Sequence, residues 1–188
     1  MKGFIGLVAL IALTAGCHTV KTPRQAVEQS AANPAAMSFP EVSEFVPSGH
    51  PVGSCVTESE MEADQAIRLH AEMMVTGLTC HAHYREPTLF SRYQRFTVDH
   101  AERIRESQQT MGDFLGRYGS GASQRLFDAY QTQLANDEAR LMSEVTAPTY
   151  CQLRRDMFYA AAGFDGAELE AYVARLVERY RDRYRVCG

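Results

Sequence analysis

The sequence has very little lysine, no strong net charge and no long hydrophobic run. Lys2 and Lys21 are its two lysines, and the 188 residues carry a formal net charge of −4. Positive and negative residues are interspersed, so the chain lacks the basic surface that nucleic-acid binding requires. The apolar stretch at residues 4–15 is shorter than the roughly 20 residues of a membrane-spanning helix. These absences exclude nucleic acid as a partner and argue against a transmembrane helix.

Motifs for catalysis and cofactor binding are also lacking. The chain contains no phosphate-binding glycine loop, no H-E-x-x-H, no EF-hand loop and no paired-carboxylate motif. It also lacks the G-x-S-x-G motif that would support a serine nucleophile. The sequence therefore favours a non-enzymatic protein without a cofactor.

The N-terminus has the order of an export signal. Lys2 supplies a positive charge, residues 4–15 form a short apolar core, and small residues lead to a cysteine. The last five residues of this segment resemble the lipobox of bacterial lipoproteins: Leu13-Thr14-Ala15-Gly16-Cys17. That resemblance implies cleavage before Cys17 and acylation of Cys17 with palmitate or a similar chain. Because His18 and not aspartate follows, it also implies sorting to the outer membrane, facing the periplasm. The alternative is a plain secretory signal that releases the protein into the periplasm.

The four other cysteines predict a disulfide framework. An even number of cysteines in an exported chain is typical of paired thiols, and three pairings of Cys55, Cys80, Cys151 and Cys187 are possible. We favour Cys80–Cys151, which would join the end of one expected helix to the start of another. The second pair, Cys55–Cys187, would tie the beginning of the domain to its last residues.

The mature chain divides into a tether and a helical domain. Residues 1–16 form the signal peptide, and residues 17–57 contain five prolines, which exclude a continuous helix. Residues 58–188 show helical periodicity. We expect five helices, near residues 60–80, 88–118, 122–145, 149–163 and 165–184. Cys187 should continue the apolar stripe of the last helix. The predicted fold is an all-α bundle of about five helices, stapled by two disulfides.

One candidate polar site would lie between the expected helices 88–118 and 122–145. Tyr93 and His100 fall on the first of these helices, and Thr132 and Asn136 fall on the second. An inward-facing Asn136 must find a partner, because an unpaired buried polar group costs about 1–3 kcal/mol. The four residues would form either a functional pocket or a structural hydrogen-bond network, and we favour the network.

Two further groups of residues suggest weaker sites. His81 and His83 carry metal-binding side chains next to Cys80, but a second ligand pair is missing, so we favour hydrogen bonds to a helix end. The last helix carries a basic face of five arginines: Arg175, Arg179, Arg181, Arg183 and Arg185. This face could adhere to an anionic polymer, although a solvated surface is the better interpretation. The tyrosines between these arginines should face the core.

These observations lead to two functional hypotheses. The first is an envelope lipoprotein that is held to the membrane by its lipid and acts as a non-enzymatic scaffold or binding module for another envelope component. The second is a small ligand-binding, metal-binding or enzymatic helical domain that uses the polar site between helices 88–118 and 122–145. Residues 69–158 also resemble small helical secreted proteins of bacteria, a similarity that implies no activity.

Overall fold

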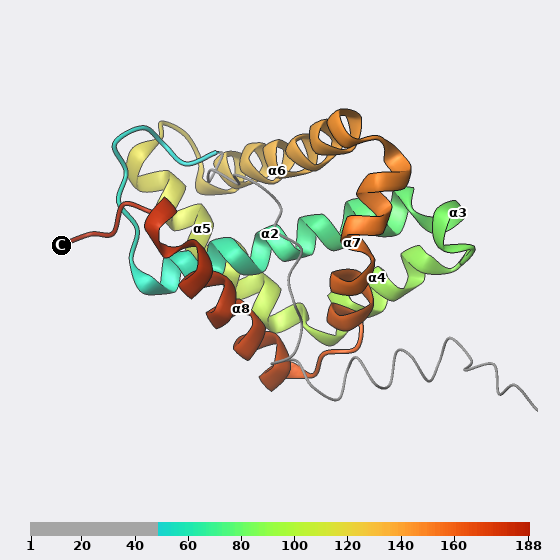
Figure 1. Ribbon diagram of the computed structural model, residues 1–188. Helices are drawn as coiled ribbons and strands as arrows, with labels where there is room; N and C mark the ends of the chain where they lie inside the picture. Colours follow the sequence, from blue (N-terminus) through green and yellow to red (C-terminus); the bar gives the residue numbers. More distant parts are fainter. Residues whose placement is uncertain (1–48) are drawn as a thin grey trace, which may run out of the picture.

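The computed structural model describes residues 49–188, which form an all-α domain (Figure 1). Within these residues there are seven α-helices and one 3₁₀ helix. They are α2 (Glu58–Thr79), α3 (His81–Tyr84), α4 (Leu89–Asp99), α5 (Ala101–Tyr118), α6 (Ser123–Val145), α7 (Ala147–Ala161), α8 (Gly166–Tyr180) and η2 (Arg181–Arg183). The predicted all-α class is confirmed. The signal peptide, Cys17 and residues 17–48 of the tether lie outside the described residues.

The expected helix 88–118 is two helices that meet at His100. The backbone of His100 has φ −111° and ψ 22°, so α4 ends one residue before it and α5 begins one residue after it. The imidazole packs on the ring of Phe96 and places Nε2 3.1 Å from the carbonyl oxygen of Phe164. This break and the single turn of α3 raise the number of helices from the expected five to seven.

The junction between α6 and α7 is shorter than the sequence suggested. Thr146 alone separates the two helices, with a φ of 74°. Pro148 was expected to precede the next helix, but it lies inside the first turn of α7. A proline is tolerated there because the first-turn N–H groups have no partner within the helix.

Helix α2 forms the centre of the domain. It runs through the middle of the molecule, with α6 along one side and α8 along the other (Figure 1), and it also contacts α4, α5 and α7. Thr57 and Glu60 cap its N-terminus reciprocally. Because helices surround it, α2 buries residues on most of its faces.

The apolar core consists of two clusters that share α2. One cluster packs the C-terminal half of α2 against α4, α7 and α8 through Met73, Leu89, Phe158 and Val173. The other packs the N-terminal half against α5 and α6 through residues that include Ile67, Phe114 and Phe127. Burying one such large side chain stabilises the fold by about 1.5–3 kcal/mol.

Both favoured disulfides are present. Cys80, which follows α2, is bonded to Cys151 in the first half of α7, and Cys55 is bonded to Cys187. Cys187 does not continue a helical stripe, however, because helix α8 ends at Tyr180. It lies in an extended segment whose neighbour Val186 forms a parallel bridge with Val56. The N–H of Cys187 donates to the carbonyl oxygen of Val56.

No helix among residues 49–188 has both the length and the apolar character needed to cross a lipid bilayer.

We predict that each disulfide contributes several kcal/mol to stability. The paired cysteines are 71 and 132 residues apart, and chain-entropy arguments give upper values of roughly 4 and 5 kcal/mol for such loops. The double variants Cys80→Ala/Cys151→Ala and Cys55→Ala/Cys187→Ala should each lower the free energy of unfolding in urea. The second variant should lose at least as much as the first. An unchanged denaturation midpoint in either variant would contradict the expectation.

Candidate functional site

A row of polar residues runs along one buried face of α2. Asp64, Arg68, Glu72 and Thr76 follow one another at intervals of four residues, so they lie on one side of the helix. Asp64 and Thr76 are 0% exposed, and Arg68 is 4% exposed. We call these four residues the polar stripe. Buried charges are costly unless they are paired. The helices around the stripe must therefore supply opposite charges and hydrogen-bond partners.

Asp64 is held by partners from both ends of the domain. Nε of Arg68 lies 3.0 Å from both carboxylate oxygens. The hydroxyl of Tyr130 donates to Oδ1, and the hydroxyl of Tyr184 donates to Oδ2. Nε2 of His50 lies 3.3 Å from Oδ2. These contacts join α2 to α6, to the C-terminal segment and to the residues that precede α2.

These contacts keep Asp64 charged and its tyrosine partners protonated. Burial alone would raise the pKa of Asp64, but the charge of Arg68, the nearby imidazole of His50 and the hydrogen bond from Tyr130 hold it well below its ordinary value. Burial and the nearby carboxylate together raise the pKa of Tyr130 and of Tyr184. Asp64 therefore acts as a permanent anion that organises hydroxyl donors, not as a proton carrier.

His50 reaches Asp64 because Gly49 allows the chain to pass Tyr130 closely. Gly49 has a φ of 87°, and a Cβ on it would lie 2.8 Å from the Tyr130 ring. The imidazole of His50 then packs among the rings of Phe114, Tyr130 and Tyr184, with centroids 5.0–6.3 Å away. The end of the predicted tether is thus anchored in the core of the domain.

A second buried cluster joins α6 and α7 to the far end of the stripe. The guanidinium of Arg154 donates to both oxygens of Glu138 at 2.8–3.1 Å. The hydroxyl of Tyr150 donates to Glu138 at 2.7 Å and lies 3.4 Å from Oγ1 of Thr76. Although burial opposes the charged form of Arg154, the carboxylates of Glu72 and Glu138 raise its pKa.

Glu72 lies between the two clusters. Its carboxylate is 4.0 Å from the guanidinium of Arg154, and 23% of its side chain is exposed. Burial raises the pKa of Glu72 to about 7; the charge of Glu138 acts in the same direction, while Arg154 and Arg68 oppose it. Three carboxylates, counting Asp64, meet two guanidinium groups here, so one negative charge is in excess. Glu72 is therefore the member of the stripe that can gain or lose a proton near neutral pH.

The predicted polar site is not assembled. Tyr93 lies on α4 with its hydroxyl 3.1 Å from Nε2 of His70, whereas His100 contacts Phe96 and Phe164. Thr132 is exposed and donates to the carbonyl oxygen of Asp128, and Asn136 is exposed.

The rotation of α6 about its own axis explains why the predicted site does not form. Asn136 points outward because the residues that follow it, Asp137 and Glu138, occupy the buried side of the helix. The buried polar network therefore lies between α2, α6 and α7, not between the helices that carry Tyr93 and Asn136.

His70 is a buried histidine of α2. Its Nε2 lies 3.1 Å from Oγ1 of Thr97, at the same distance as from the Tyr93 hydroxyl. Burial lowers the pKa of His70 to about 4, so the ring is neutral at pH 7. It serves as a polar link between α2 and α4.

The histidines of α3 lie on the surface. His81 and His83 are both exposed, and Nδ1 of His81 lies 3.1 Å from the carbonyl oxygen of Leu78, which fits the favoured interpretation of hydrogen bonds to a helix end. Cys80 is in a disulfide. No group of three or more His, Cys, Asp or Glu side chains within residues 49–188 is arranged to hold a metal ion.

The arginines of the C-terminal region contact tyrosines and a carboxylate of the same domain. Arg179 and Arg183 lie over the ring of Tyr180, at 5.7 and 4.8 Å from its centroid, and Arg175 lies over Tyr172. The tyrosines face the core, as expected: Tyr172 and Tyr184 are buried, and Tyr180 packs against the core cluster. Arg181 pairs with Glu58.

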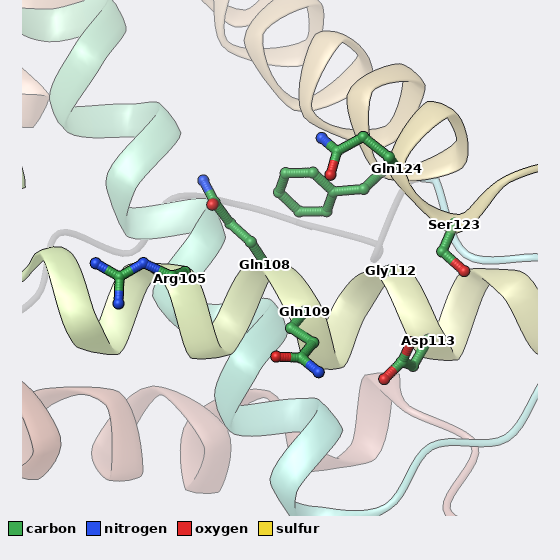
Figure 2. A pocket seen from close by; sticks show the side chains of 8 residues that line it. Arg105, Gln108, Gln109, Gly112, Asp113, Ser123 and Gln124 are labelled. Atoms are coloured by element: carbon green, nitrogen blue, oxygen red, sulfur yellow. The ribbon is translucent and has the colours of Figure 1, made fainter.

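A polar pocket opens on the surface between α5 and α6 (Figure 2). Its volume is about 230 Å³. Its walls carry Arg105, Gln108, Gln109 and Asp113 from α5 and the first residues of α6. Sequence analysis did not single out these residues, because exposed glutamines on a helix have the pattern of an ordinary solvated face.

The chain matches no protein-family model, no curated protein and no solved structure.

We predict that Glu72 makes stability depend on pH. The folded protein keeps a proton on Glu72 up to about pH 7, whereas the unfolded chain releases it near 4.5. The stability gained from this proton is complete below pH 4.5 and is lost as the pH rises through 7. At about 1.4 kcal/mol per pH unit, the loss is at most roughly 3 kcal/mol.

The Glu72→Gln variant should lack this loss, because glutamine stays neutral. Urea unfolding of both proteins at pH 5, 6, 7 and 8 measures the difference, with the exposed Glu106→Gln of α5 as the control. Parallel pH curves for wild type and Glu72→Gln would show that Glu72 titrates as it does in an unfolded chain.

Arg154 should be far more important for stability than its exposed neighbour Arg155. Removing one partner of a buried ion pair costs about 3–5 kcal/mol, because the other charge is left without compensation. We expect a loss of this size for Arg154→Met and less than about 1 kcal/mol for the matched Arg155→Met. Adding Glu138→Leu to Arg154→Met should recover part of the loss. If the double variant is less stable than the single one, the pair is not coupled as described.

Proposed function

We propose that the protein is an exported lipoprotein, anchored through Cys17 to the outer membrane and facing the periplasm, which acts as a non-enzymatic binding module for another envelope component. The observation that carries this proposal is the state of the cysteines. All four cysteines among residues 49–188 are paired in disulfides. Such bonds form and persist in oxidising compartments outside the cytosol.

The N-terminal pattern supports the lipid anchor. Cys17 directly follows the small residues of the lipobox-like run, and about 30 residues separate it from the first described residue. His50 and the Cys55–Cys187 disulfide fasten the last part of this connection to the domain. A firm attachment of this kind suits a domain that is held at a membrane and presents its surface to a partner.

The distribution of polar groups supports binding at the surface. Inside the domain, Asp64 is paired with Arg68 and Glu138 is paired with Arg154. The pocket between α5 and α6, in contrast, is open to solvent and lined by side chains with donors and acceptors. The function is therefore one of recognition at an outer face of the bundle.

The lipid anchor is tested by metabolic labelling. In a bacterial host fed with radiolabelled palmitate, the wild-type protein should carry label and fractionate with the outer membrane. Cys17→Ala should carry no label and leave the membrane fraction. His18→Asp should keep the label but move to the inner membrane, as the sorting rule of bacterial lipoproteins implies. Thr19→Ala serves as the matched control and should behave as wild type.

Thiol chemistry provides the second readout. In the wild-type protein, the cysteines at positions 55, 80, 151 and 187 should react with an alkylating reagent only after reduction. Recovery of an unlabelled, uncleaved chain from the cytosol with all its thiols free would overturn the proposal.

A further inference from the structure

The pocket between α5 and α6 has the features of a ligand site. Arg105, Gln108, Gln109 and Asp113 have the spacing i, i+3, i+4 and i+8, which places them on one face of α5. This spacing usually marks an apolar face that packs on a neighbouring helix. Here the face is polar, and these side chains make no hydrogen bond or ion pair with any described residue. Their donors and acceptors are directed to solvent inside a concavity.

The opposite wall comes from the start of α6, and the floor comes from both helices. Ser123 and Gln124, in the first turn of α6, complete the polar lining, and Figure 2 shows Gln124 on the α6 side of the pocket, across from Gln108. The amide of Gln124 is held on α6, where its Nε2 donates to Asp128 at 2.8 Å. The helices approach closely at Gly112, where a Cβ would lie 3.7 Å from Ser123. Gly112 and the ring of Phe127 are the buried part of the lining. The pocket thus combines polar walls with an apolar floor.

We infer that this pocket binds a single sugar ring of a neutral envelope glycan. The amides of Gln108 and Gln109 each offer two donor hydrogens and an acceptor oxygen, which suits hydroxyl groups that also donate and accept. Phe127 is 4% exposed, so it and Gly112 contribute a small apolar floor that the C–H groups of the ring can touch at its edge. Arg105 and Asp113 carry opposite charges, so the pocket as a whole favours neither anions nor cations.

The size of the pocket restricts the ligand. A volume of about 230 Å³ is below the roughly 300–1,000 Å³ of pockets for drug-sized molecules. It accommodates one ring and leaves neighbouring rings of a chain in solvent. An extended peptide, whose amides also match glutamine, needs a longer groove. The inference rests on the proposed binding role, and it holds whether or not Cys17 is acylated.

Ligand-observed NMR tests the inference. The full chain, purified in detergent, would be examined by saturation-transfer difference with N-acetylglucosamine, its linear tetramer and tetraglycine as probes. A ligand of this size binds with a Kd on the order of 1 mM. We expect saturable transfer to both sugars and none to tetraglycine.

Variants show whether the pocket is responsible. The double variant Gln108→Ala/Gln109→Ala should weaken sugar binding at least tenfold without changing the melting temperature, because both side chains lie outside the core. Gln152→Ala, an exposed glutamine of α7, is the matched control and should bind as wild type. Three results would overturn the inference. They are unaltered sugar binding by the double variant, binding of tetraglycine in place of the sugars, and no saturation by either sugar up to about 20 mM. None of these results would affect the palmitate-labelling test of the anchor.

Discussion

The structure depends on neutralising the charged face of a central helix. Helix α2 is surrounded by α4, α5, α6, α7 and α8, yet it carries Asp64, Arg68 and Glu72 on the side that meets its neighbours. An uncompensated charge in such a place would cost several kcal/mol. The partners are therefore specified by chemistry as well as by shape: Tyr130 and Glu138 come from α6, and Arg154 comes from α7. The apolar clusters are arranged around these contacts.

The covalent bonds lie at the two ends of the same helix. Cys80 follows α2 and ties it to α7, while Cys55 precedes α2 and ties it to the end of the chain. Between them the stripe joins α2 to α6, α7 and the C-terminal Tyr184. Helix α2 is thus fixed by disulfides at its ends and by ionic and hydroxyl contacts along its length. An oxidising environment is a condition for this arrangement, which connects the fold to the proposed location.

Inside and outside, the polar groups of this domain have different roles. The buried charges form ion pairs inside the domain, Asp64 with Arg68 and Glu138 with Arg154. Within the polar stripe, Glu72 is the residue that can exchange a proton near neutral pH. On the surface, the face of α5 around Gln108 and Gln109 keeps its donors and acceptors available. This contrast favours recognition on the surface and a structural role for the buried network. The stapled bundle and the open pocket, together with the proposed anchor, are the basis for proposing a recognition domain held near a membrane.

The sequence alone was sufficient for the all-α class, because helical period is a local signal, and it favoured both disulfides among three possible pairings. It did not identify the polar stripe, since residues four apart with alternating charge, such as Asp64, Arg68 and Glu72, have the same pattern on a solvated face. Nor did it place Glu138 inside and Asn136 outside. Only tertiary structure decided these points, because the buried side of a polar helix is chosen by the partners that can pair its charges, and those partners are distant in the chain.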